Sequence, residues 1–126
     1  MGTDETIRNA AGQVLKSGDG FVVFDDGNEL EYVQFSKERG GLMMMWPSEG
    51  PRVPAGDDVR SLLESLGFTE GDDIQNVAPG TFVVEADGLY AGFGGDLDLV
   101  DHFTTAAFER VYGRLGLQKL NARVNV

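Results

Sequence analysis

The spacing of apolar residues along the chain predicts three helices. The first carries a single apolar stripe at helical spacing and ends near Gly18. The stripe consists of Ile7, Ala10, Ala11, Val14 and Leu15. The second is a short, Leu-rich helix that ends at Leu66, with Gly67 as a left-handed cap. The third spans residues 97–115, and its apolar stripe is wider than one core contact uses, which favours additional contact with a partner.

Five short runs of apolar and aromatic residues, separated by turn-forming residues, predict five strands. They span residues 21–24, 30–35, 42–46, 81–86 and 89–93. Asp-Asp-Gly-Asn at 25–28, Gly-Gly at 40–41 and Asp-Gly at 87–88 supply the turns that join consecutive strands. Pro47 ends the third run, because proline has no N–H to give to a central ladder. Consecutive strands joined in this way build an antiparallel sheet.

The elements therefore follow in the order α-β-β-β-α-β-β-α. We expect one α+β domain over residues 1–126, with a five-stranded, mainly antiparallel sheet and three helices. A length of 126 residues, 41% of them hydrophobic, suits one domain with one core. No further element is predicted in residues 116–126, which we interpret as a C-terminal tail.

Composition excludes several classes of partner. Ten Lys and Arg against 21 Asp and Glu give a net charge of −11, which repels nucleic-acid phosphates and anionic lipid surfaces. The absence of Cys excludes disulfides and thiolate metal sites. The first residues are acidic, unlike a signal peptide, and no stretch reaches the roughly 20 apolar residues of a membrane span. We therefore expect a soluble cytoplasmic protein that binds neither nucleic acid nor membranes.

Few side chains of this chain are suited to catalysis. His102 is the only histidine, and no Gly-x-Ser-x-Gly motif supplies a nucleophile for it. Its neighbours Asp96, Asp98 and Asp101 offer oxygens that suit a hard cation. The start of a helix explains two of these carboxylates without a metal, because Asp96 caps free N–H groups and Asp98 complements the helix dipole. We therefore predict no enzyme activity, cofactor or metal; the alternative is a small metal-dependent enzyme that uses these four residues.

The third predicted strand is the strongest candidate for a binding surface. Met43 and Met45 project to one face of the sheet, and the residues between them project to the other, so both faces are apolar. A two-layer domain covers one face only. Methionine adapts to irregular surfaces, and tryptophan is a frequent interface anchor. With cross-strand neighbours on the preceding strand, the candidate partner-binding residues are Tyr32, Phe35, Met43, Met45 and Trp46. The alternative is that both faces belong to the core.

The element order, together with two local motifs, resembles a known group of proteins. Tyr-Val-Gln-Phe at 32–35 and Leu-Leu-Glu-Ser-Leu-Gly-Phe at 62–68 are similar to the superfamily of type III secretion chaperones and YbjN-like proteins, over roughly residues 4–115. The resemblance implies helices packed on an antiparallel sheet, frequent homodimers, and a role in holding or regulating other proteins without catalysis. We therefore expect a non-catalytic protein-binding module that forms a homodimer, with room for a protein or peptide client.

Overall fold

A computed structural model of the chain describes residues 2–25, 27, 32–38, 40–47, 56–85, 88–113 and 120–126. The first half contains α1 (Gly2–Lys16), β1 (Phe21–Asp25), β2 (Tyr32–Glu38), β3 (Gly41–Pro47) and α2 (Gly56–Ser65). The second half contains β4 (Thr69–Glu70), a short 3-10 turn η1 (Ile74–Asn76), β5 (Thr81–Glu85), β6 (Gly88–Gly94), α3 (Leu97–Ala106), a π-helical turn η2 (Ala107–Val111) and β7 (Asn121–Asn125).

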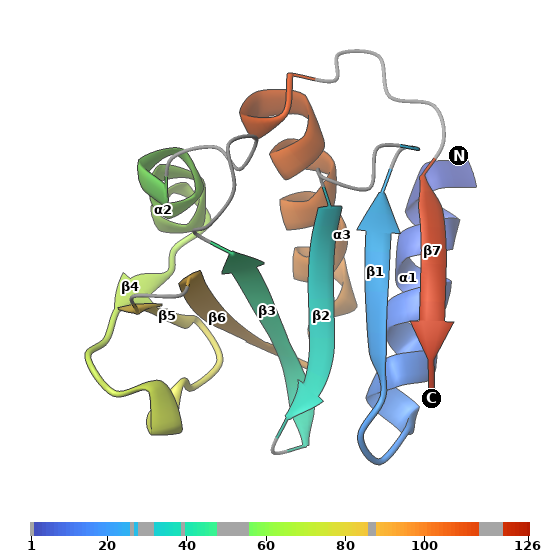
Figure 1. Cartoon of the computed structure of the whole chain (residues 1–126), viewed down its shortest axis with the longest axis horizontal. Coiled ribbons are helices and arrows are strands. Elements are labelled where there is room, and N and C mark those ends of the chain that lie inside the picture. Colours follow the sequence, from blue (N-terminus) through green and yellow to red (C-terminus); the bar gives the residue numbers. More distant parts are fainter. Residues whose placement is uncertain are drawn as a thin grey trace.

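The strands of the described residues form one seven-stranded sheet in the order β4-β5-β6-β3-β2-β1-β7 (Figure 1). Neighbouring strands pair antiparallel, except that β4 and β5 run parallel. The structure confirms an α+β fold with three α-helices, but the prediction of a five-stranded, mainly antiparallel sheet is wrong, because the sheet has seven strands and is mixed. The predicted element order is also wrong, since β4 and β7 add two strands to it.

Both missed strands lie at the edges of the sheet. Thr69 and Glu70 of β4 are exposed, so this strand has no apolar residue to reveal it. β7 falls in the segment that was interpreted as a tail, and it alternates polar residues with Ala122 and Val124, which pack on the core from one side only. Edge strands bury little side-chain surface, so apolar periodicity gives a weak signal for them.

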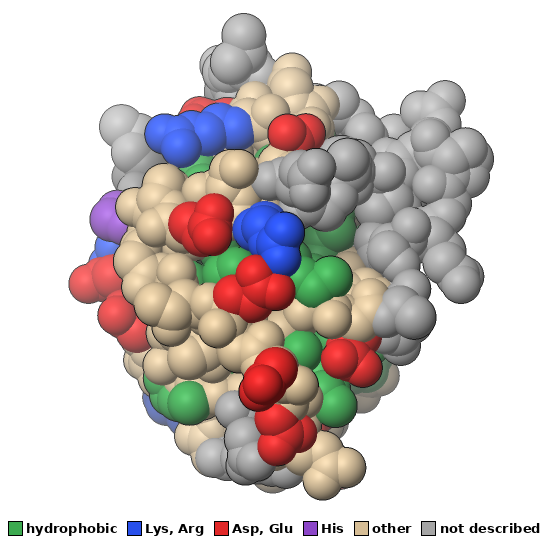
Figure 2. Space-filling view, turned by 90° about the vertical axis from the view of Figure 1, so that its left-hand side faces the viewer, with side chains coloured by type: hydrophobic (Ala, Val, Ile, Leu, Met, Phe, Trp, Pro, Cys, Tyr) green, Lys and Arg blue, Asp and Glu red, His purple; other side chains and the backbone are tan. Residues whose placement is uncertain are grey.

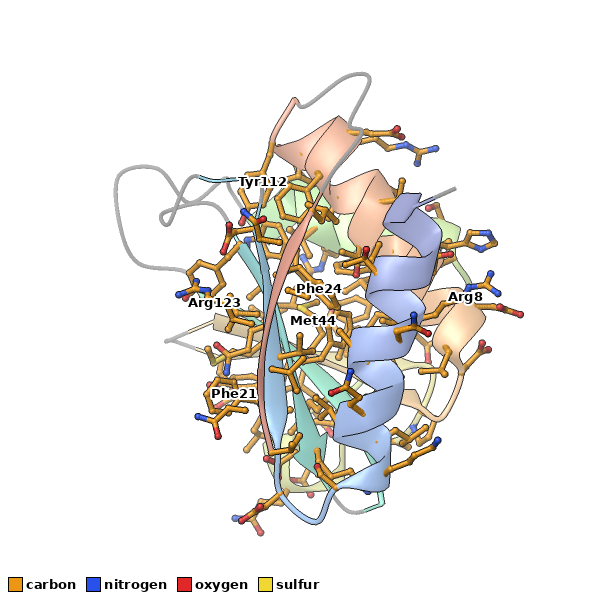
Figure 3. All side chains as sticks on the ribbon, turned by 90° about the vertical axis from the view of Figure 1, so that its right-hand side faces the viewer. Arg8, Phe21, Phe24, Met44, Tyr112 and Arg123 are labelled. Carbon is orange, nitrogen blue, oxygen red and sulfur yellow. The ribbon has the colours of Figure 1, made fainter. Side chains whose placement is uncertain are left out.

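The helices pack on one face of the sheet, and the opposite face points away from them. Figure 3 shows Phe24 and Met44 pointing from the strands toward α1, whereas Phe21 and Arg123 point to the opposite side. We call that opposite side the open face. The core lies under the helices, where the ring of Phe35 contacts those of Phe93 and Phe103 at centroid distances of 5.1 and 6.5 Å.

α3 lies between α1 and α2 and contacts both (Figure 1). Val100, Phe103 and Phe108 are buried, and the remaining apolar residues of α3 and η2 pack against the core. The wide stripe of this helix is therefore used by the sheet and the two neighbouring helices. Gly67 has the predicted left-handed backbone, with φ of 95°. None of the helices in the described part of the chain is long and apolar enough to cross a membrane.

Candidate partner-binding face

The chain itself covers part of the open face. Val83 of β5 points to this face, yet it is only 2% exposed. The segment that contains η1 lies against neighbouring β6, where the N–H of Gly80 donates to the carbonyl oxygen of Gly92 at 2.9 Å. A Cβ atom at Gly92 would lie 2.5 Å from the carbonyl oxygen of Ala78. Only glycine at this position lets the segment lie so close to the sheet.

The rest of the open face remains accessible on β7, β1, β2, β3 and one residue of β6. Strand register places side chains of β1, β2 and β3 in adjacent rows, with Phe21 opposite Ser36, Ser36 opposite Met43, and Gln34 opposite Met45. We call this area the open half-face. It consists of Phe21, Val23, Tyr32, Gln34, Ser36, Met43, Met45, Tyr90, Asn121, Arg123 and Asn125, all partly or fully exposed.

The structure divides the five predicted binding residues between the two faces of the sheet. Tyr32, Met43 and Met45 lie on the open half-face and are partly exposed. Phe35 and Trp46 are 0% and 2% exposed and belong to the core. These two are therefore removed from the candidate surface, because a side chain under the helices cannot touch a partner while the domain stays folded. Of the two faces of β3, the one that carries Trp46 is core.

Sequence reasoning missed three apolar members of the open half-face. Phe21 and Val23 lie on β1, and Tyr90 lies on β6 directly opposite Met45. The signal was present in the first predicted strand, where residues 21–24 are apolar at every position, as in the third strand. A strand that is apolar on both faces implies that its second face also meets apolar surroundings. Applied to β1 as well as β3, this rule identifies Phe21 and Val23.

A polar cluster at the end of β1 pairs the carboxylate of Asp25 with a cation of the same chain. Asp25 is 5% exposed and accepts hydrogen bonds from the backbone N–H of Gly27 (3.0 Å) and the amide of Asn121 (3.3 Å). The guanidinium of Arg123 completes its shell at 3.2 Å. Because Arg123 and Asn121 belong to β7, this cluster also ties the edge strand to β1. Asp25 is thus neutralised within the chain.

The centre of the open half-face carries no other carboxylate among the described side chains. This contrasts with the chain as a whole, which has 21 acidic residues and a net charge of −11. It also contrasts with the flank formed by α2, β4 and β5, where acidic side chains are spread over the surface (Figure 2). The open half-face is therefore a surface with little charge at its centre, where Gln34 and Ser36 of β2 lie between the apolar side chains of β1 and β3, on an otherwise acidic protein.

The second candidate site, around the start of α3, is occupied by structural interactions. Asp96 caps the helix and accepts from the N–H of Leu99 at 3.0 Å. Asp98 and Asp101 both pair with Arg8 of α1, at 2.9 and 3.2 Å. His102 is exposed. Within the described ranges, no three His, Asp or Glu side chains gather in a way that could hold a metal ion. The geometry thus accounts for each carboxylate through a helix cap or an ion pair.

Comparison with known proteins adds no relative. A scan against models of protein families, a search of curated proteins and a search of solved structures each found no match. The resemblance to type III secretion chaperones and YbjN-like proteins stays a prediction.

Proposed function

We propose that this protein is a non-catalytic protein-binding module that holds or regulates a protein partner, as the resemblance to secretion chaperones and YbjN-like proteins implies. The partner surface is the open half-face, and the expected setting is the cytoplasm. One observation carries the proposal: β1 and β3 each place apolar side chains on the face of the sheet that the helices leave uncovered, and Tyr90 lies opposite Met45 on the same face. An antiparallel sheet with one solvated face normally alternates apolar and polar positions. Here β1 and β3 are apolar on both faces.

The composition of the open half-face supports protein binding over solvent contact. The centres of protein interfaces are poor in charged residues and rich in aromatic residues and methionine. Phe21, Tyr32 and Tyr90 supply the aromatic rings, and Met43 and Met45 supply adaptable side chains. Gln34 and Ser36 of β2 lie between the apolar side chains of β1 and β3 and offer hydrogen-bonding groups inside the interface, whereas Asn121 and Asn125 of the edge strand β7 suit its polar rim.

A second copy of the chain is the first partner we propose for this face. Two chains that each carry a net charge of −11 repel each other, so they associate best through a surface with little unpaired charge. The centre of the open half-face meets this condition, since Asp25 is paired with Arg123 and Glu38 lies at the margin, at the end of β2. Two such faces pack as aligned sheets around a two-fold axis, with the same patch used by both copies. Because salt screens the repulsion, association strengthens as ionic strength rises.

Oligomeric state in solution tests the proposal directly. Light scattering coupled to size-exclusion chromatography should return a dimer for the wild-type chain, and Met45→Glu should return a folded monomer, because it places a charge in the centre of the interface. Val84→Glu is the matched control, since Val84 is 49% exposed and lies on the other face of the sheet. It should remain dimeric. A strict monomer at high protein concentration and high salt contradicts the homodimer, and a dimer that survives Met45→Glu contradicts this surface.

A further inference from the structure

A groove lies at the margin of the open half-face, between β3 and the segment that covers β6. Two hollows of about 250 and 210 Å³ share Glu38 and Val77 in their linings, so they adjoin. Most of the other lining residues are apolar or glycine. The apolar lining residues come from both walls of the groove and are Leu42, Met43, Ile74, Val77, Ala78 and Pro79. We call this feature the Glu38 groove.

Among the residues that the structure describes, Glu38 is the only charged one that lines either hollow. It lies at the end of β2, on the same face as Ser36, and its side chain is exposed. No ion pair or hydrogen bond joins its carboxylate to another of the described residues. By contrast, Asp25, the carboxylate at the other end of the open half-face, forms an ion pair with the guanidinium of Arg123. Glu38 is therefore a negative charge at an apolar groove with no cation of the described chain to neutralise it.

We propose that the Glu38 groove takes a lysine or arginine side chain from an extended segment of a partner protein. This inference rests on the proposed function, and it names the chemistry of a client. The methylene stem of a lysine or arginine packs on apolar surface while its charged head stays at the solvent boundary. Val77 and Met43 supply that apolar surface, and Glu38 supplies the opposite charge for a charge-assisted hydrogen bond.

Two further features favour a basic client over a second copy in this groove. The net charge of −11 attracts cationic segments at long range and speeds their encounter with the protein. Within the described ranges, a second copy offers few free cations, because most of the basic residues there are already engaged within their own chain. Those residues are Arg8, Lys37, Arg60 and Arg123. In an extended segment, every second side chain points the same way. A lysine in the groove therefore places the side chain two positions away at the margin of the open half-face, where an apolar residue suits the surroundings of Met43.

Peptide binding tests the proposal with a defined probe. The probe is a fluorescein-labelled peptide of repeated Lys-Ser-Val-Ser, in which lysine and valine share one side of an extended chain, and the comparison peptide has glutamine in place of lysine. Fluorescence anisotropy at physiological salt gives the dissociation constants. We expect the lysine peptide to bind more tightly than the glutamine peptide. Glu38→Gln should weaken the lysine peptide by about three- to fivefold, and Glu38→Arg by at least about tenfold.

Glu64→Gln is the matched control, because Glu64 is an exposed carboxylate on α2, away from the groove, and its loss changes net charge equally. It should leave the dissociation constant unchanged. Equal weakening by Glu38→Gln and Glu64→Gln overturns the groove, because attraction is then a property of the whole charged surface. Equal binding of the two peptides, or binding of neither, also overturns it. If Met45→Glu abolishes binding of both peptides while the Glu38 variants do not, the result supports protein binding at the open half-face and contradicts the proposal that the Glu38 groove binds a basic side chain.

Discussion

The hydroxyl of Tyr112 donates a hydrogen bond of 2.8 Å to the backbone carbonyl oxygen of Tyr32, which joins the end of the helical layer to the first residue of β2. The ring of Tyr112 also stacks on the indole of Trp46, with centroids 5.2 Å apart and an angle of 20° between the planes. One side chain thus links α3 and η2 to two neighbouring strands. It fixes the backbone of Tyr32, whose own ring lies on the open half-face.

Removing this hydroxyl separates the hydrogen bond from the stacking. We expect Tyr112→Phe to lower the free energy of unfolding by about 1 kcal/mol, because the bond to Tyr32 is lost while the ring stays on Trp46. Tyr112→Ala should lower it by about 3–5 kcal/mol, because the ring leaves a cavity. Urea unfolding followed by the fluorescence of Trp46 measures both. Equal losses for the two variants would show that the ring contributes nothing beyond its hydroxyl.

The two faces of β3 should respond oppositely to the same substitution. Trp46→Glu buries a carboxylate among the aromatic rings of Phe103 and Tyr112, so we expect a loss of several kcal/mol, on the order of 3 or more, and a chain that does not fold at moderate temperature. Met45→Glu places the carboxylate on the open half-face and should retain a cooperative thermal transition. Circular dichroism melts of the two variants check this. Unfolding of both variants would mean that Met45 also belongs to the core.

Apolar periodicity predicted the elements that bury a face and missed those that do not. The three helices and the five inner strands were predicted because residues such as Val14, Phe35 and Leu63 recur at the period of their element and are fully buried. β4 and β7 have no such repeat, since one is only two residues long and exposed and the other alternates Asn and Arg with small apolar residues. Their assignment needs the partner strand, which periodicity does not supply.

The candidate site was predicted in part, for a reason specific to β3. In a strand that is apolar on both sides, every second residue is apolar whichever face is chosen. The sequence of such a strand therefore does not indicate which face the helices cover. The structure decides this: Met44 and Trp46 lie under the helices, and Met43 and Met45 lie on the open face. The covering segment around η1 was also beyond prediction, because its contact with the sheet depends on the absence of a side chain at Gly92.

A methyl group at Gly92 should displace the segment that covers β6. Gly92→Ala brings a Cβ to 2.5 Å from the carbonyl oxygen of Ala78. This oxygen belongs to the backbone, which cannot move aside as easily as the end of a flexible side chain. We expect a loss of about 1–3 kcal/mol in the free energy of unfolding, together with faster amide hydrogen exchange at Gly80. Gly71→Ala is the control, because its Cβ meets Val83 at an ordinary 3.7 Å. A stability of Gly92→Ala equal to that of Gly71→Ala would contradict the close packing.

Arg8 should matter to Asp101 much more than to Asp98. Asp101 is 4% exposed, whereas the Asp98 side chain is 71% exposed, so losing Arg8 leaves a buried charge only at Asp101. We expect Arg8→Met to lower the free energy of unfolding by about 1–3 kcal/mol, because a buried carboxylate loses its main partner. Asp98→Asn should lower it by less than about 1 kcal/mol, since an exposed ion pair contributes little. Urea unfolding of both variants gives the comparison.

Asp98→Asn also separates this structural role from the metal-dependent enzyme. A divalent cation bound to the carboxylates of α3 would stabilise the native state by mass action, so Mg²⁺ or Ca²⁺ would raise the melting temperature of the wild-type chain. Asp98→Asn would then lose that rise. We expect neither cation to change the melting temperature of either protein, because Asp96 serves as a helix cap and Asp98 and Asp101 pair with Arg8. A stoichiometric metal in the purified wild-type protein that is absent from Asp98→Asn would contradict the non-catalytic proposal.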